Sequence, residues 1–246
     1  SVVEKTFKSH DISVTARNLL KDREAPMNLK EHMDVDAVTF GIMQALDILN
    51  KEEQTIDIED GHMLQIKEYL TLLDLVAEID LEYLPEVDKK GKVVVITQPG
   101  MRYAQANAIV EHMLLDAKFM ELSLADRQRV LERLRNEIRG RMMEDIILLE
   151  TKLANPQKHV FKLQFAVGEF DMVVADPKML NCEIYEVKYS KEQVQDQYRH
   201  LKDETKCELT EHRYGEITGR YVIYRGEAME ADGVQYLNVE EYLKGL

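Results

Sequence analysis

The sequence predicts an α/β protein built in two parts, and three observations lead to this prediction. Its 246 residues are 45% apolar, which is enough for one large or two smaller packed cores. Apolar residues at helical spacing dominate residues 36–154, interrupted by one hairpin pattern. Beyond residue 155 the pattern changes to short apolar strands with a charged helix among them. We therefore expect a first domain over residues 1–100 and an α/β domain over residues 101–246.

Composition narrows the class of protein. The formal net charge of −14 works against a broad nucleic-acid surface but leaves room for a local site, because phosphate binding depends on clustered Lys and Arg. Cys182 and Cys207 have no ligand-like spacing to each other or to the histidines, which disfavours structural zinc and disulfides and fits a reducing compartment. No apolar run approaches the roughly 18 residues of a membrane span, and residues 1–10 lack a signal-peptide core. We expect a cytoplasmic protein without a membrane segment.

The first domain combines helices with a hairpin. Residues 36–50 and 62–76 place apolar side chains at helical spacing, and each segment follows a polar stretch with Asp that can cap a helix. Two β-prone segments then flank the turn sequence Asp-Lys-Lys-Gly at 88–91. Two helices followed by a hairpin predict a winged-helix-like domain, although a small helical bundle with an incidental hairpin fits the same pattern. The second helix is too acidic to read a DNA groove, so we expect it to face protein or to be structural.

The second domain alternates helices and strands. The expected elements are helices at 103–118 and 124–154, strands at 159–166, 169–176 and 182–190, a helix at 191–209, a strand at 220–226, and a terminal helix capped by Asn238. The first three strands follow one another closely and predict an antiparallel meander. The third and fourth are joined by a helix, so they should be parallel with a right-handed crossover. We expect an α/β sandwich around a mixed sheet.

Charged residues interrupt two of the apolar strands. In the stretch IYEVKYS, Glu186 and Lys188 are two residues apart and therefore share one face with Ile184. Asp171 interrupts the preceding strand in the same way. Burying such groups without partners is costly, so they form either an exposed ion pair or a polar site.

A polar site at this position has a clear chemical interpretation. Two carboxylates on adjacent strands, Asp171 and Glu186, can converge on one Mg²⁺ or Mn²⁺ ion, which takes a few carboxylate oxygens and keeps several waters. Lys188 is then placed to orient or help deprotonate an attacking water. The cation would stabilise charge that develops on a phosphate.

Three further polar residues could belong to this site. Glu144 lies in the long predicted helix on a face that is otherwise apolar, and Gln197 lies about two turns into the helix after the motif strand. A Glu there can bind a metal through water or a second ion, and a Gln can hold a phosphate or a water. The alternatives are a solvated Glu144 near Arg141 and an exposed Gln197. Glu169 should share the face of Asp171, and we interpret it as an exposed polar strand end.

These motifs resemble a known superfamily. Glu144, then Asp171 in GEFD, then Glu186-Val187-Lys188, then Gln197-Tyr198 are similar to the PD-(D/E)xK, or restriction-endonuclease-like, superfamily, with Phe170 in place of the usual Pro. More narrowly, the segments VVVITQPGMRYAQA, GRMMEDIILLE, GEFDMVV and IYEVKYS are similar in order to the C-terminal half of bacterial and archaeal AAA-type ATPases. Those proteins have an ATPase module, a winged helix and a nuclease-like domain of unknown function. The resemblance implies a restriction-endonuclease-like fold in residues 101–246 and an ATPase module that precedes this sequence.

Two functions follow from the resemblance. The first is a Mg²⁺- or Mn²⁺-dependent nuclease acting on DNA or another nucleic acid, with Asp171 and Glu186 as metal ligands, Lys188 positioning water, and Glu144 and Gln197 in support. The second is a catalytically inactive module that binds a partner or regulates the ATPase, because this fold also has degenerate members. No Gly-rich phosphate loop ending in Gly-Lys-Ser/Thr occurs in the sequence, so we expect no P-loop ATPase site here.

Overall fold

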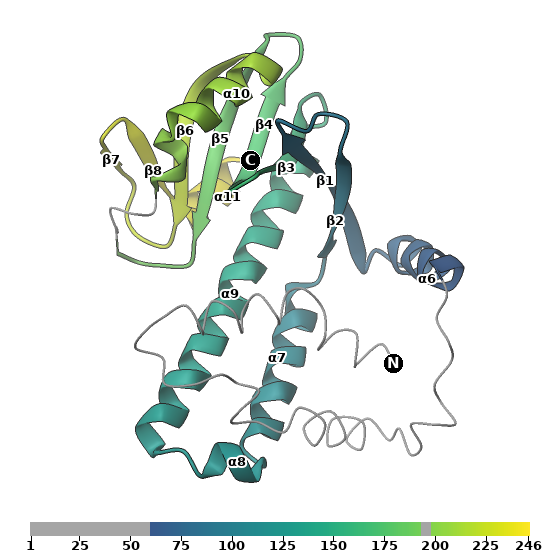
Figure 1. Cartoon of the computed structure of the whole chain (residues 1–246), viewed down its shortest axis with the longest axis vertical. Helices are drawn as coiled ribbons and strands as arrows, with labels where there is room; N and C mark the ends of the chain where they lie inside the picture. Colours follow the sequence, from purple (N-terminus) through teal and green to yellow (C-terminus); the bar gives the residue numbers. More distant parts are fainter. Residues whose placement is uncertain (1–59, 193–197) are drawn as a thin grey trace. The chain divides into compact units, whose positions relative to one another are not determined.

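The computed structural model describes residues 60–192 and 198–246 (Figure 1). The chain forms two compact units, Ser1–Glu68 with Gly100–Ile138 and Tyr69–Pro99 with Arg139–Leu246. In the first unit, the described residues are 60–68 and 100–138. None of the helices in the described part of the chain is long and apolar enough to cross a bilayer.

The described part of the first unit is helical. It contains most of α6 (Asp60–Leu72) and α7 (Pro99–Met113), all of α8 (Ala117–Met120), and the beginning of α9 (Leu124–Ala154). The α9 helix begins after Ser123, whose Oγ accepts a hydrogen bond from the Asp126 amide at 3.1 Å and donates to the Asp126 carboxylate at 2.6 Å. This cap satisfies the Asp126 amide, which has no partner within the helix. The helices predicted at 103–118 and 124–154 are thus confirmed, and α7 begins and ends a few residues earlier than expected.

The second unit is built on one eight-stranded mixed sheet in the order β2-β1-β3-β4-β5-β6-β8-β7. Its strands are β1 (Val76–Leu84), β2 (Lys90–Ile96), β3 (His159–Phe165), β4 (Glu169–Asp176), β5 (Asn181–Lys188), β6 (Glu216–Tyr224), β7 (Met229–Ala231) and β8 (Val234–Asn238). The β3, β4 and β5 strands form the predicted antiparallel meander. The β5 and β6 strands are parallel, also as predicted, with α10 (Glu204–Tyr214) between them in sequence. The expected mixed α/β class is confirmed.

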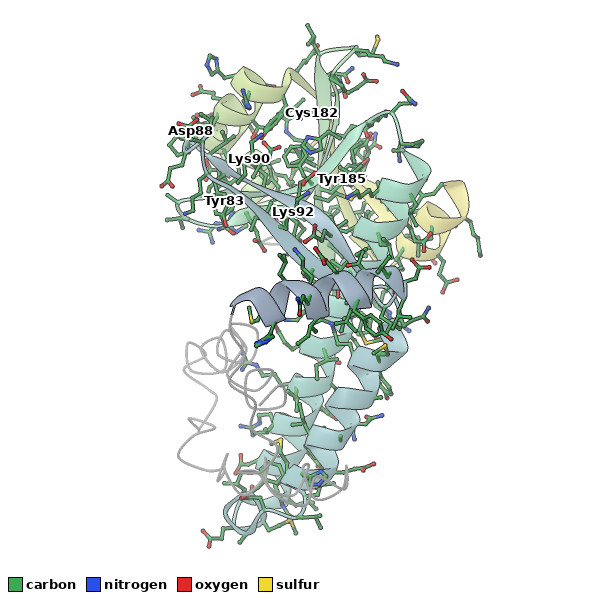
Figure 2. All side chains as sticks on the ribbon, turned by 90° about the vertical axis from the view of Figure 1, so that its right-hand side faces the viewer. Tyr83, Asp88, Lys90, Lys92, Cys182 and Tyr185 are labelled. Atoms are coloured by element: carbon green, nitrogen blue, oxygen red, sulfur yellow. The ribbon has the colours of Figure 1, made fainter. Side chains whose placement is uncertain are left out.

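The predicted hairpin is present and joins this sheet. The β1 and β2 strands are antiparallel, and Figure 2 shows Asp88 at the turn between them and Lys90 and Lys92 along β2. The β1 strand also pairs in parallel with β3, with Asp80 opposite Phe161. The helix expected at 36–50 lies outside the described residues, and the one expected at 62–76 ends at Leu72, so the winged-helix arrangement stays a prediction.

Each face of the sheet has its own hydrophobic core. On one face, α10 and the 3₁₀ turn η2 (His200–Lys202) cover a core that includes Phe161, Phe170, Val173, Ile184, Leu201, Cys207 and Tyr236. On the other face, α9 and the terminal helix α11 (Val239–Gly245) cover a core that includes Ile79, Met143, Ile147, Met172, Tyr185, Val187 and Tyr242. Burial of one such large side chain contributes about 1.5–3 kcal/mol. The unit is therefore an α/β sandwich, as Figure 1 shows for α10 and α9.

The start that the sequence predicts for the helix over 191–209 is wrong. Residues 189–192 are not helical, residues 193–197 lie outside the described residues, and α10 begins only at Glu204. The reason is Asp203, which has extended backbone angles (φ −68°, ψ 107°) and accepts a hydrogen bond from the Lys206 amide at 3.2 Å. An N-cap of this kind begins a new helix.

The β7–β8 hairpin is absent from the sequence prediction. Asp232 and Gly233 form its turn, with φ of 53° and 73°. Two consecutive positive φ angles at an Asp-Gly pair are typical of tight hairpins.

The cap of the last helix is confirmed, because the Asn238 side chain accepts from the amides of Glu240 and Glu241 at 2.9 and 3.2 Å.

Candidate active site

A β-bulge in β4 determines where Asp171 lies. Phe161 pairs with Val173, whereas Leu163 pairs with Phe170, so two residues of β4 lie opposite one residue of β3. Alternation along β4 is interrupted there, and Phe170 and Val173 belong to the same core. Bulges re-aim side chains and are common beside active sites. Asp171 is one of the two β4 residues opposite Lys162, and its Oδ2 accepts a hydrogen bond of 2.8 Å from the Val187 amide of the neighbouring strand β5.

The structure brings Glu186 and Lys188 together with Asp171. Ile184 lies in the core beneath α10, and by strand alternation Glu186 and Lys188 share this face, as the sequence predicts. The Lys188 Nζ is 2.6 Å from Glu186 Oε2 and 3.6 Å from Asp171 Oδ2. One ammonium therefore lies between two carboxyl groups from adjacent strands.

Glu144 joins the site through a lysine that the sequence analysis missed. The Lys162 Nζ is 3.4 Å from Glu144 Oε2 and 3.8 Å from Glu169 Oε1. Glu144 is thus ion-paired on α9 and not simply solvated, and Glu169 is 40% exposed at the start of β4. The signal for Lys162 was present, because it interrupts the apolar strand HVFKLQF just as Asp171 and Glu186 interrupt theirs. Gln197, the remaining predicted site residue, lies outside the described residues.

Burial and neighbouring charges shift the pKa values of the two carboxyls in opposite directions. Asp171 and Glu186 are 5% and 2% exposed, whereas the Lys188 side chain is 35% exposed. Burial, together with the neighbouring Asp171, raises the pKa of Glu186 to about 8. Burial also opposes ionisation of Asp171, but Lys188, Lys162 and the Val187 amide outweigh it and lower the pKa of Asp171. At neutral pH the pair therefore holds one carboxylate and one proton.

The basic groups and Glu144 complete this electrostatic arrangement. Burial disfavours the charged form of Lys188, but Asp171 and Glu186 outweigh it, so the pKa of Lys188 is raised. The pKa of Lys162 is raised in the same way by Glu144 and Glu169. Burial and Asp171 raise the pKa of Glu144 to about 7. Opposed pKa shifts of neighbouring carboxyls are a feature of sites that bind cations or transfer protons.

The residues fit a hard divalent cation as a two-carboxylate site. Within the described residues, no three His, Cys, Asp or Glu side chains converge as a metal cluster. Magnesium does not require one, because it is often bound by one or two carboxylates with water completing its octahedron. In the structure the Lys188 ammonium lies between the carboxyls of Asp171 and Glu186. A bound cation would take over this charge-neutralising role, and the partly exposed Lys188 side chain would turn away.

The two thiols do not supply an alternative chemistry. Cys182 and Cys207 are both buried and unbridged. Burial raises the pKa of Cys182 to about 12 and raises the pKa of Cys207 as well. Because the thiolate is the nucleophile, neither cysteine is reactive at neutral pH.

Comparisons of this chain with protein-family models, with curated proteins and with solved structures found no match.

Proposed function

We propose that this chain has a metal-dependent phosphodiesterase site that hydrolyses nucleic acid, with Asp171 and Glu186 as the ligands of Mg²⁺ or Mn²⁺. One observation supports this proposal above all others. Two almost fully buried carboxyls from adjacent strands meet at a single ammonium group that is itself partly exposed. In this proposal a divalent cation replaces the ammonium between the two carboxyls.

A purely structural role explains this cluster less well. Buried ion pairs seldom stabilise a fold more than apolar residues of the same volume would, because of the cost of desolvation. Here the cost of desolvation is especially high. Glu186 must keep a proton near neutral pH to avoid a second buried negative charge beside Asp171. Such an arrangement is expected where a ligand supplies the missing positive charge.

Each residue of the site has a distinct role in this proposal. Asp171 is held in place by the Val187 amide and stays ionised, so it is the permanent anionic ligand. Glu186 becomes a ligand after it loses its proton. Lys188 donates hydrogen bonds to the attacking water or to a phosphate oxygen. Glu144, with a pKa of about 7 and an ion pair to Lys162, can hold or release a proton close by. A bound divalent cation would stabilise the negative charge on the phosphate.

Calorimetry tests the metal site directly. Mg²⁺ and Mn²⁺ are titrated into the wild-type protein, into an Asp171→Ala/Glu186→Ala double variant, and into Glu183→Gln as a matched control. Glu183 lies on the same strand, but its carboxylate accepts from the Tyr185 hydroxyl at 2.9 Å and it is not part of the cluster. We expect binding to the wild type and the control only. Equal binding, or none, in all three proteins would remove the basis of the proposal.

A cleavage assay tests the chemistry. Labelled single-stranded and duplex DNA, and RNA, are incubated with the wild type and with Glu186→Ala in the presence of Mn²⁺. We expect the substitution to lower cleavage at least about 100-fold, because loss of a ligand should cost no less than the roughly 10–100-fold loss seen for the outer partners of metal ligands. The far-UV circular dichroism should stay the same. Retained cleavage in this variant would exclude Glu186 as a ligand.

The alternative is a catalytically inactive module that binds a partner or regulates an ATPase. The direct contact of Lys188 with Glu186 favours it, because a lysine–carboxyl contact of this kind can persist in a site that has lost its metal. Metal-independent folding together with the absence of metal binding would support this alternative. In this alternative we propose that the partner is an ATPase module, which would precede this sequence in a longer protein.

A further inference from the structure

A histidine and a buried lysine lie beside the candidate active site on the face covered by α10. Gly168 forms the turn between β3 and β4, with φ of 82°, and lies three positions before Asp171. A Cβ added at Gly168 would lie 3.0 Å from the His200 Cε1 and 3.0 Å from the Lys206 Nζ. Both side chains therefore pack directly on this turn, and only glycine leaves space for them.

The lysine fixes the protonation of the imidazole. The Lys206 side chain is 9% exposed, and its Nζ lies 2.7 Å from the Nδ1 of His200. An ammonium has three protons and no acceptor, so His200 must accept at Nδ1 and hold its own proton at Nε2. The Asp203 carboxylate at 3.7 Å and the Phe165 ring at 5.5 Å stabilise the ammonium.

The surroundings keep this imidazole neutral. Partial desolvation of the ring and Lys206, followed by Lys188, lower the pKa of His200, while Asp171 and Asp203 act in the opposite direction. The adjacent Leu201 anchors η2, because it is fully buried in the same core as Phe170 and Ile184.

The arrangement is unusual for a structural contact. A nearly buried lysine donates to a histidine that is exposed. Burial of a lysine is costly, and a surface histidine needs no fixed tautomer for folding. A fixed Nε2–H group at the solvent boundary is, however, suited to donate a hydrogen bond to an anion.

We propose that His200 binds a phosphate oxygen of the nucleic-acid backbone through its Nε2–H, and that Lys206 is the positioning residue that fixes this tautomer. This inference rests on the proposed function, since it concerns the substrate of the same site. It adds a phosphate-binding group to the side of the site opposite Glu144, from residues of η2 and α10. It would also help an acidic chain to hold a polyanion locally, because His200 would add a hydrogen-bond donor beside the turn that leads into β4.

The test measures binding apart from cleavage. All variants are made in a Glu186→Gln background, which prevents turnover, and short fluorescein-labelled DNA and RNA strands are titrated without a divalent metal by fluorescence anisotropy. We expect His200→Ala to weaken binding about tenfold, as for loss of one hydrogen bond to a charged group, and His200→Gln to restore part of it. His212→Ala, on the exposed surface of α10, is the matched control and should bind as the background protein does.

Nitrogen NMR of the His200 imidazole distinguishes phosphate binding from a purely structural role, because a structural histidine would not respond to the oligonucleotide. We expect the Nε2–H tautomer of His200 in the free protein, a shift of the Nε2 resonance on adding the oligonucleotide, and loss of the single tautomer in Lys206→Met. Unchanged binding in His200→Ala, or a His200 resonance insensitive to bound oligonucleotide, would overturn the inference alone. If no strand binds to or is cleaved by any variant, including the wild type, both the inference and the proposed function fall.

Discussion

Glu186 keeps its proton at neutral pH because a second ionised carboxyl beside Asp171 would be buried with too little compensation. Metal binding must therefore displace a proton. We expect the affinity for Mn²⁺ to rise between pH 6 and pH 8, by at most about tenfold per pH unit, because one proton is released. Titration calorimetry in two buffers with different ionisation enthalpies measures this release.

Two variants show whether Glu186 or Glu144 releases that proton. Glu186→Gln should abolish the pH dependence together with most of the binding. Glu144→Gln should retain the metal but remove any part of the release that arises from Glu144, whose pKa is about 7. A pH-independent affinity in the wild type would contradict the proposed role of Glu186.

The same proton affects stability. A carboxyl whose folded-state pKa is raised above its unfolded value binds more protons in the folded state, so it lowers the free energy of unfolding as pH rises between the two values. For Glu186 this interval runs from the ordinary value of 4.5 to about 8. We expect Glu186→Gln to be more stable than the wild type at pH 9 by at least about 1 kcal/mol, and by less at pH 5. Urea unfolding at both pH values checks this, and a variant less stable at pH 9 would contradict it.

Single residues were predictable where a charge interrupts an apolar strand. Asp171, Glu186 and Lys188 were found in this way, and the structure places them in contact. Lys162 also interrupts an apolar strand, but its role depends on its contact with Glu144 of α9. No local sequence pattern predicts that α9 packs against the sheet at this point. The bulge at Asp171 could not be predicted either, since its register becomes apparent only when β3 and β4 are paired.

At the scale of elements, a glycine ends α10 and brings the chain back to the sheet. Gly215 has φ of 93°, and a Cβ added there would lie 1.8 Å from the Leu180 carbonyl oxygen. We expect Gly215→Ala to destabilise the protein by about 3 kcal/mol or more, because the backbone conformation is strained and the carbonyl cannot move aside freely. Thermal unfolding measures the loss.

Gly233→Ala is the matched control for this substitution. Gly233 also has a positive φ, 73°, but a Cβ added there meets no atom within 4 Å. The expected loss is about 1 kcal/mol, from backbone strain alone. Equal losses at the two positions would show that the close approach to Leu180 does not determine the stability of this turn.

The order of the elements was more predictable than their ends. The meander and the parallel pair β5–β6 follow from loop lengths and the position of a helix. The start of α10 was missed because polar residues from 191 to 209 fit a helix throughout, and Asp203 interrupts it only through its cap. The β7 and β8 strands are short, so the Asp-Gly turn was their main signal.

For the molecule as a whole, the hairpin β1–β2 should unfold together with the central sheet. Ile79 of β1 is fully buried in the core that also contains Met143 of α9 and Met172 of β4. We expect Ile79→Ala to cost about 2–5 kcal/mol and to speed hydrogen exchange in β4 and β5 as well as in the hairpin. Val94→Ala, at a position 43% exposed on the same hairpin, should change little. Faster exchange confined to the hairpin would show that it is an independent unit.

The parallel pairing of β1 with β3 has a consequence for synthesis on the ribosome. Asp80 pairs with Phe161, which lies about 80 residues later in the chain. At about 5–20 residues per second, β1 leaves the ribosome roughly 4–16 s before its partner exists. During this time the nascent hairpin has an unpaired edge, and such edges invite association with other chains. Glu78, Asp80 and Glu82 charge β1, and Lys90 and Lys92 charge β2, so we expect these side chains to limit association at the unpaired edge during this interval.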